Sequence, residues 1–214
     1  VQIYGGCDPF APAADQTQAL GKSLAGVEPG LRAFIKRCRD RDVRWNVGIA
    51  EWNWWMQASH WDGRAFEEPP TALHCLYIAG MIRRFAALGP DFEMACFYNL
   101  VNCMGILNHR GADVEATDAV RIFKLYRPAV PGRFVPVGLK GGATGDEALV
   151  EALALENDAG RWLFLANRSA TEPARVSLES FKPAGAKVEG FTASSPTGTL
   201  AKAKVKLDGN MIGL

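Results

Sequence analysis

The sequence predicts two regions of different class: a mixed α/β region with a parallel sheet, then an all-β region. The first prediction rests on the order strand, helix, strand, helix, strand, helix, because parallel neighbouring strands need such crossover connections. The second rests on short strand-like segments after Pro131, which Gly, Asn-Asp and Ser-Pro turns separate and where no helical stripe occurs. We therefore divide the chain into residues 1–130 and residues 131–214.

Three strands and three helices are expected in the first region. The predicted strands cover residues 1–4, 45–50 and 92–98. A loop rich in Gly, Pro and Asp is expected after the first strand, through Asp15. The predicted helices begin near residues 28, 71 and 117, with apolar residues at helical spacing. Pro29 suits a helix start, and Gly89-Pro90 and Pro128 mark the ends of the other two helices.

Six short strands are expected in the second region, as an antiparallel sandwich of the jelly-roll kind. They are Phe134–Leu139, Leu149–Leu155, Arg161–Ala166, Ala174–Leu178, Lys187–Phe191 and Lys202–Leu207.

The composition indicates an ordinary globular protein and argues against several kinds of partner. Among 214 residues, 48% are hydrophobic and the formal net charge is +1, so the basic field of a nucleic-acid-binding protein is missing. No apolar run reaches the roughly 18 residues that span a membrane. Five cysteines, an odd number without a Cys-x-x-Cys pair, predict neither a zinc site nor a disulfide framework, and favour a reducing compartment such as the cytoplasm. No metal or cofactor is expected.

One carboxylate, Glu51, follows a predicted strand and precedes a cluster of tryptophans, Trp52-Asn53-Trp54-Trp55. In a (β/α)8 barrel the catalytic groups lie at the C-terminal ends of the strands. Flat aromatic faces beside a carboxylate suit a sugar ring, which has an apolar C–H face and polar hydroxyls. The alternative is a surface Glu after an edge strand, with the tryptophans in the core.

Two motifs at the ends of neighbouring strands resemble those of family 51 glycoside hydrolases, the α-L-arabinofuranosidases. The family has Asp-Glu-Trp-Asn after barrel strand seven, where this chain has Ala50-Glu51-Trp52-Asn53. It has Gln-Leu-Val-Asn after strand eight, where this chain has Asn99-Leu100-Val101-Asn102. The resemblance implies the C-terminal part of a TIM barrel followed by a β-sandwich. Ala50 and Asn99 depart from the family pattern.

The resemblance implies retaining hydrolysis of arabinose-containing polysaccharides or oligosaccharides, with Glu51 as the nucleophile. The predicted substrate-binding residues are Tyr4, Trp52, Asn53, Trp54, Asn99 and Asn102. Of these, Asn53 is expected to orient the loop more than to bind sugar. One or two of Trp52, Trp54, Trp55 and Trp61 should face the substrate, and the others should be structural.

The acid/base residue that a retaining mechanism needs is not expected in this chain. In the family it follows an Asn at the end of strand four, and none of Asp8, Asp62, Glu67 and Glu68 fits that role. About 130 residues hold three strand–helix units, whereas a barrel needs about 250 residues. We therefore expect a missing N-terminal barrel segment, in the same or a separate chain. The resemblance also implies homo-oligomers.

Two alternatives remain open on the sequence. One is another retaining barrel glycosidase, such as a xylosidase or an agarase, which would also place a Glu at this strand end. The other is a non-catalytic carbohydrate-binding relative, which the departures at Ala50 and Asn99 keep open.

Overall fold

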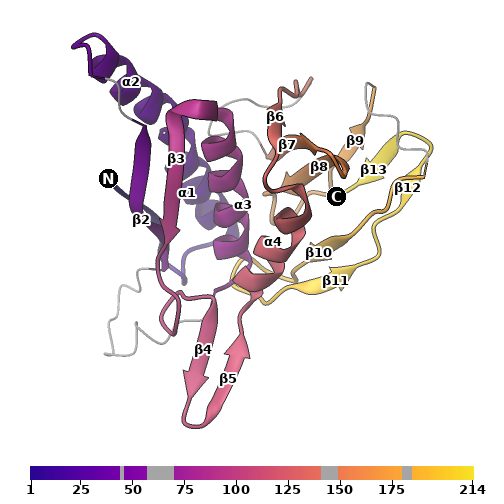
Figure 1. Cartoon of the computed structure of the whole chain (residues 1–214). Helices are drawn as coiled ribbons and strands as arrows, with labels where there is room; N and C mark the ends of the chain where they lie inside the picture. Colours follow the sequence, from indigo (N-terminus) through magenta and orange to yellow (C-terminus); the bar gives the residue numbers. More distant parts are fainter. Residues whose placement is uncertain (44–45, 57–69, 141–148, 180–184) are drawn as a thin grey trace.

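A computed structural model of the chain describes residues 1–43, 46–56, 70–140, 149–179 and 185–214. Its first part contains a parallel sheet with the strand order β1-β2-β3, of which β2 and β3 are labelled in Figure 1. The three strands span Gln2–Cys7, Val47–Met56 and Phe92–Phe97. Helices connect them, which confirms the prediction of a mixed α/β region with a parallel sheet.

Four α-helices accompany this sheet: α1 (Ala13–Ala25), α2 (Val27–Arg39), α3 (Ala72–Ala87) and α4 (Asp118–Tyr126). Short 3-10 turns follow α3 (Gly89–Asp91) and α4 (Arg127–Ala129). The sequence analysis missed α1, because the prolines around it suggested a loop through Asp15. The helix begins directly after Pro12, and Leu20 and Leu24 from its apolar side are fully buried.

The second strand is longer than predicted. We expected it to end at Ala50, but β2 continues to Met56, so the tryptophans belong to a strand rather than to a loop. Three steps along β2, from Ile49 to Trp52, match two steps along β3, and this irregularity is a β-bulge. The bulge lets Ile49 and Trp52, three residues apart, both be buried against the helices. Glu51, next to Trp52, therefore lies on the opposite face.

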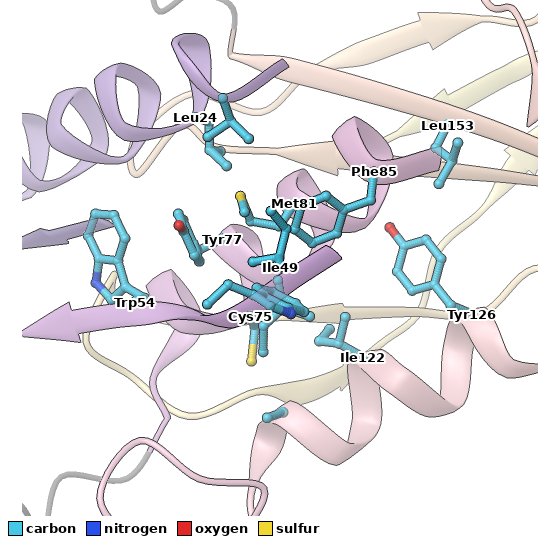
Figure 2. Close-up of a cluster of buried hydrophobic side chains, with 14 of the residues drawn as sticks. Leu24, Ile49, Trp54, Cys75, Tyr77, Met81, Phe85, Ile122, Tyr126 and Leu153 are labelled. Carbon is cyan, nitrogen blue, oxygen red and sulfur yellow. The ribbon is translucent and has the colours of Figure 1, made fainter. Parts of the chain in front are cut away.

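The main hydrophobic core lies between the parallel sheet and the helices, and it continues to the strands that follow. Figure 2 shows Trp54 of β2 beside Tyr77 of α3, and Leu153 near Tyr126 of α4. The rings of Trp54 and Tyr77 have centroids 5.4 Å apart. One buried cluster thus holds α3 between the sheet and β7.

The second part of the chain consists of antiparallel strands, in agreement with the predicted change of class. They form sheets β6-β7-β8, β12-β13-β9 and β10-β11. Their bounds are β6 Arg133–Val135, β7 Val150–Asn157, β8 Gly160–Asn167, β9 Arg175–Ser177, β10 Gly190–Thr192, β11 Ala201–Ala203, β12 Leu207–Asp208 and β13 Met211–Gly213. No helix of the described residues is long and apolar enough to cross a membrane.

An antiparallel hairpin between β3 and α4 was also missed by the sequence analysis. It comprises β4 (Leu107–Arg110) and β5 (Asp113–Ala116), with Gly111 at a positive φ of 61° in the turn. Its strands carry mostly polar residues, so the alternation of apolar and polar residues that identifies a strand is weak here.

Candidate functional site

Glu51 opens onto a cleft on the face of the parallel sheet that the helices leave uncovered. The cleft has a volume of about 490 Å³ and is lined by Tyr4, Gly5, Gly6, Glu51, Trp55 and Tyr98. All of these residues come from β1, from β2 or from the end of β3. Glu51 lies within β2, just before the position where β3 ends opposite Trp52. The cleft is thus formed where the last strand of the sheet stops.

A tyrosine from the neighbouring strand holds the Glu51 carboxylate. The Tyr4 hydroxyl donates a hydrogen bond to Glu51 Oε2, with an O···O distance of 2.9 Å. Burial raises the pKa of Tyr4 above its ordinary value, and the hydrogen bond to Glu51 raises it further. Tyr4 therefore stays a neutral donor at physiological pH. It fixes one carboxylate oxygen and leaves the other available for chemistry.

Three aromatic rings form the walls of the cleft around this carboxylate. The Tyr4 ring meets Trp55 edge-on at 6.5 Å and Tyr98 edge-on at 6.3 Å between centroids. Tyr4 is 39% exposed and Tyr98 40% exposed, so each ring keeps surface available to a ligand. Aromatic surface beside a carboxylate suits a ligand with both apolar and polar faces, such as a sugar.

Two glycines of β1 have no room for a side chain. A Cβ atom at Gly6 would lie 2.3 Å from the backbone oxygen of Trp55. At Gly5 it would lie 2.8 Å from the Trp54 ring. Both separations are shorter than atoms tolerate, so Gly6 lets β1 lie close to the β2 backbone, and Gly5 leaves room for the buried Trp54 ring on the helix side.

The structure places Trp52, Asn53 and Trp54 away from the cleft. Trp52 is 2% exposed and packs edge-on against Phe85 and Phe97. Trp54 and Asn53 are fully buried. The bulge in β2 turns both tryptophan rings toward the helices, so neither ring lines the cleft. Trp55 is the tryptophan of this cluster that lines it, whereas Trp61 lies outside the described residues.

Asn53 acts on the loop after β3 rather than on the cleft. Its side-chain amide donates hydrogen bonds to the backbone oxygens of Tyr98 and Met104, the latter at 2.9 Å. Its oxygen accepts the N–H of Trp54 at 2.7 Å. Asn53 therefore ties the end of β3 to β2, which agrees with the orienting role expected for it.

Asn99 and Asn102 also hold this loop and do not line the cleft. Asn99 Oδ1 accepts the N–H of Leu100 at 2.7 Å, and its amide donates to the oxygen of Val101. Asn102 Oδ1 accepts the N–H of His109 at 2.6 Å, which ties the loop to the β4–β5 hairpin. Among the predicted substrate-binding residues, the structure thus brings only Tyr4 together with Glu51.

Sequence reasoning left four cleft residues out of the predicted site: Gly5, Gly6, Trp55 and Tyr98. Tyr98 carried a usable signal, because it is the last residue of the strand predicted over residues 92–98. Trp55 was among the candidate stacking residues. The two glycines carried none, since their role depends on the distance between β1 and β2.

No second carboxylate lines the cleft within the described residues. Asp8 Oδ1 accepts the N–H of Phe10 at 2.9 Å in the turn after β1. Asp62, Glu67 and Glu68 lie outside the described residues. The described part of the chain also contains no group of three His, Cys, Asp or Glu side chains that could hold a metal ion. The cleft therefore offers one carboxylate, a neutral hydroxyl donor and aromatic walls.

No protein-family model matches the sequence, and no curated protein matches it. Solved structures do match. The family 51 arabinofuranosidase from Xanthomonas axonopodis pv. citri superposes with a TM-score of 0.71 at 17% identity, over 98% of this chain and 47% of that one. The family 51 α-L-arabinofuranosidases from Thermotoga petrophila (TM-score 0.66, 16% identity) and Bifidobacterium longum (0.67, 15%) match over 99% and 100% of this chain and 50% of theirs.

These matches concern the fold, because the identities are low, and the chain spans about half the length of the structures it matches. The match extends over almost the whole of this chain. It therefore includes the parallel sheet with its helices and the antiparallel sheets that follow. The chain therefore has the fold of a half-length portion of the family 51 arabinofuranosidases.

Proposed function

We infer that this chain contributes the nucleophile of a retaining α-L-arabinofuranosidase acting on arabinose-containing polysaccharides or oligosaccharides. The observation that carries the proposal is the Glu51 carboxylate, held by the Tyr4 hydroxyl at 2.9 Å in an open cleft with aromatic walls. The fold match to family 51 arabinofuranosidases supports the choice of substrate.

In the proposed reaction, the free oxygen of Glu51 attacks the anomeric carbon while the glycosidic oxygen leaves with a proton from an acid. A covalent glycosyl ester on Glu51 results. Water, deprotonated by the same acid group in its basic form, then attacks the anomeric carbon and releases the sugar and the Glu51 carboxylate. Tyr4 positions Glu51, and Trp55 and Tyr98 contact the sugar.

The acid/base group must come from polypeptide outside the described residues, about 5–5.5 Å from Glu51 in a retaining site. The parallel sheet supports such an addition. Met94 is 54% exposed on the uncovered face, and neither β1 nor β3 has a second strand partner in the described part of the chain. Parallel sheets are normally covered on both faces. We propose that residues 1–130 are part of a (β/α)8 barrel completed by a further segment, and that residues 131–214 form its β-sandwich domain.

The proposal is tested with a panel of nitrophenyl glycosides and the full-length protein. We expect turnover of the arabinofuranoside, and a loss of several orders of magnitude in Glu51→Gln, because an amide cannot form the glycosyl ester. Glu115→Gln, on the exposed β5 strand, is the matched control and should keep full turnover. Turnover of a xyloside or an agarose fragment instead would identify another retaining glycosidase.

A carbohydrate-binding protein without activity is the second candidate, because no second carboxylate lines the cleft within the described residues. In that case the full-length protein would bind arabino-oligosaccharides in calorimetry but turn over none of the glycosides. Glu51→Gln would then change affinity only modestly.

A further inference from the structure

The turn between β10 and β11 closes the N-terminal end of helix α3. The backbone N–H groups of Ala72 and Leu73 donate to the oxygens of Gly198 and Pro196, at 2.9 Å and 3.0 Å. The first N–H groups of a helix have no partner within the helix, and these two find theirs about 120 residues further along the chain. Figure 1 shows β10 and β11 beside the ends of α3 and α4.

The same segment is held by two side chains of α4 at the single residue Leu200. Asp118 Oδ2 accepts the Leu200 N–H at 2.6 Å, and Arg121 donates to the Leu200 oxygen. Asp118 and Arg121 are also an ion pair at 3.3 Å, and Arg121 lies over the Phe191 ring of β10. We call this set of contacts on Leu200 the Leu200 clip.

The end of α3 that this turn closes lies beneath the strands of the cleft. His74 is fully buried, and its Nδ1 accepts the N–H of Thr71 at 3.0 Å, so Nε2 carries the ring proton. That nitrogen faces the backbone of Trp54, without an ordinary hydrogen bond in the described residues. One turn later, Tyr77 contacts the Trp54 ring and faces the backbone of Gly5.

A displacement of this end of α3 would therefore reach both strands that line the cleft. Trp54 precedes Trp55, which forms one wall, and Gly5 forms part of the lining. We propose that the Leu200 clip is a positioning device, by which the antiparallel part of the chain sets the end of α3 and through it the Trp55 wall. Asp118 and Arg121 are its positioning residues. The effect on substrate rests on the proposed function, whereas the mechanical coupling does not.

Amide hydrogen exchange on the full-length protein tests the coupling. In Asp118→Ala we expect exchange at Leu200, Ala72 and Leu73 to accelerate at least about 10-fold, with Met81 in the middle of α3 unchanged. Asp118→Asn keeps an oxygen acceptor for the Leu200 N–H and should restore slow exchange at all three. Asp113→Ala, an exposed aspartate on β5, is the charge-matched control. Arg121→Ala removes the second contact and should give the same pattern if Asp118→Ala fails to fold.

Two results would overturn the proposal. In one, Leu200 exchanges faster while Ala72 and Leu73 do not, which would make the turn independent of α3. In the other, Met81 accelerates as much as Ala72, which would mean general destabilisation.

If the protein is a glycosidase, Asp118→Ala should also raise KM about 3- to 10-fold and leave kcat within about 2-fold, because Glu51 is untouched. An unchanged KM would show that the Leu200 clip does not position the Trp55 wall of the cleft. If the wild-type protein hydrolyses no glycoside, the proposed function fails, and the exchange experiment still decides the coupling.

Discussion

The parallel and the antiparallel parts of this molecule bury their hydrophobic residues to different extents. In the parallel part, Ile49 and Trp54 are fully buried between the sheet and the helices. In the antiparallel part, Leu153 and Leu155 of β7 are buried in the same core, whereas Phe191 of β10 and Ile212 of β13 are only half-buried. The first part therefore has a buried core directly behind the site, whereas the buried residues of β7 in the second part pack into that same core.

Those contacts are polar as well as apolar. Arg84 of α3 binds Glu151 of β7 through two hydrogen bonds, at 2.9 Å and 3.1 Å, and both side chains are nearly buried. Arg168 lies 4.0 Å from the same carboxylate. One nearly buried carboxylate thus links β7 to α3 and also lies near Arg168, which adds charged contacts to the apolar ones at this junction.

The largest effect should come from the core of the parallel part. We expect Trp54→Ala to lower the free energy of unfolding by about 4 kcal/mol, since it leaves a cavity between β2 and α3. Phe191→Ala should cost only about 1 kcal/mol, because its ring is half-buried under Arg121. Urea denaturation measures both. Equal losses of unfolding free energy in the two variants would show that the difference in burial between the two parts has no effect on stability.

The junction should give the next effect. Glu151→Ala leaves two buried guanidinium groups without their carboxylate and should cost about 3 kcal/mol. Glu179→Ala breaks the exposed pair with Lys140 and should change stability by less than about 0.5 kcal/mol. Thermal unfolding of both variants is the measurement. A loss for Glu151→Ala as small as that for Glu179→Ala would show that the junction does not need this charge.

A smaller effect concerns acid, and it belongs to the parallel part. Burial lowers the pKa of His74 to about 3, with the Trp54 backbone acting in the opposite direction. The unfolded chain, in which His74 has its ordinary pKa of 6.5, binds this proton more readily than the folded chain. The free energy of unfolding is therefore highest above pH 6.5 and decreases as the pH falls toward 3. Between pH 7 and pH 5 the loss is about 2 kcal/mol.

His74→Gln removes this titration and should flatten the pH dependence of unfolding over that range. His109→Gln on the exposed β4 strand should leave it as in the wild type. Urea unfolding at pH 5, 6 and 7 compares the three proteins. A His74→Gln curve as steep as the wild type would assign the acid sensitivity to other groups.

The smallest effect concerns the uncovered face of the sheet. Tyr4→Phe keeps the ring but removes the hydrogen bond to Glu51, and in an active enzyme we expect turnover to fall about 10-fold with little change in stability. Tyr98→Phe, on the other side of the cleft, should cost less. Steady-state kinetics and melting temperatures separate the two. A loss of stability in Tyr4→Phe would make the residue part of the core rather than of the site.

Much of this arrangement could be predicted from the sequence. The alternation before Glu51, the helical spacing of residues 71–88 and the turns after Pro131 led to the parallel sheet, to α3 and to the change of class. Local periodicity was enough there, because the spacing of apolar residues within a segment sets both its type and the face that it buries. The failures at α1 and at the β4–β5 hairpin have a local cause too, since prolines and polar residues obscured the periodicity.

From the sequence alone it follows that Glu51 belongs to a strand region with aromatic residues beside it, although the strand continues past Glu51 to Met56. Which aromatic side chains line the cleft depends on the tertiary structure. A bulge in β2, visible only in its pairing with β3, turns Trp52 and Trp54 into the core and leaves Trp55 beside Glu51. The side-chain period of a strand is two residues, so one extra residue exchanges the faces of everything that follows. That exchange depends on the neighbouring strand, and the local sequence does not encode it.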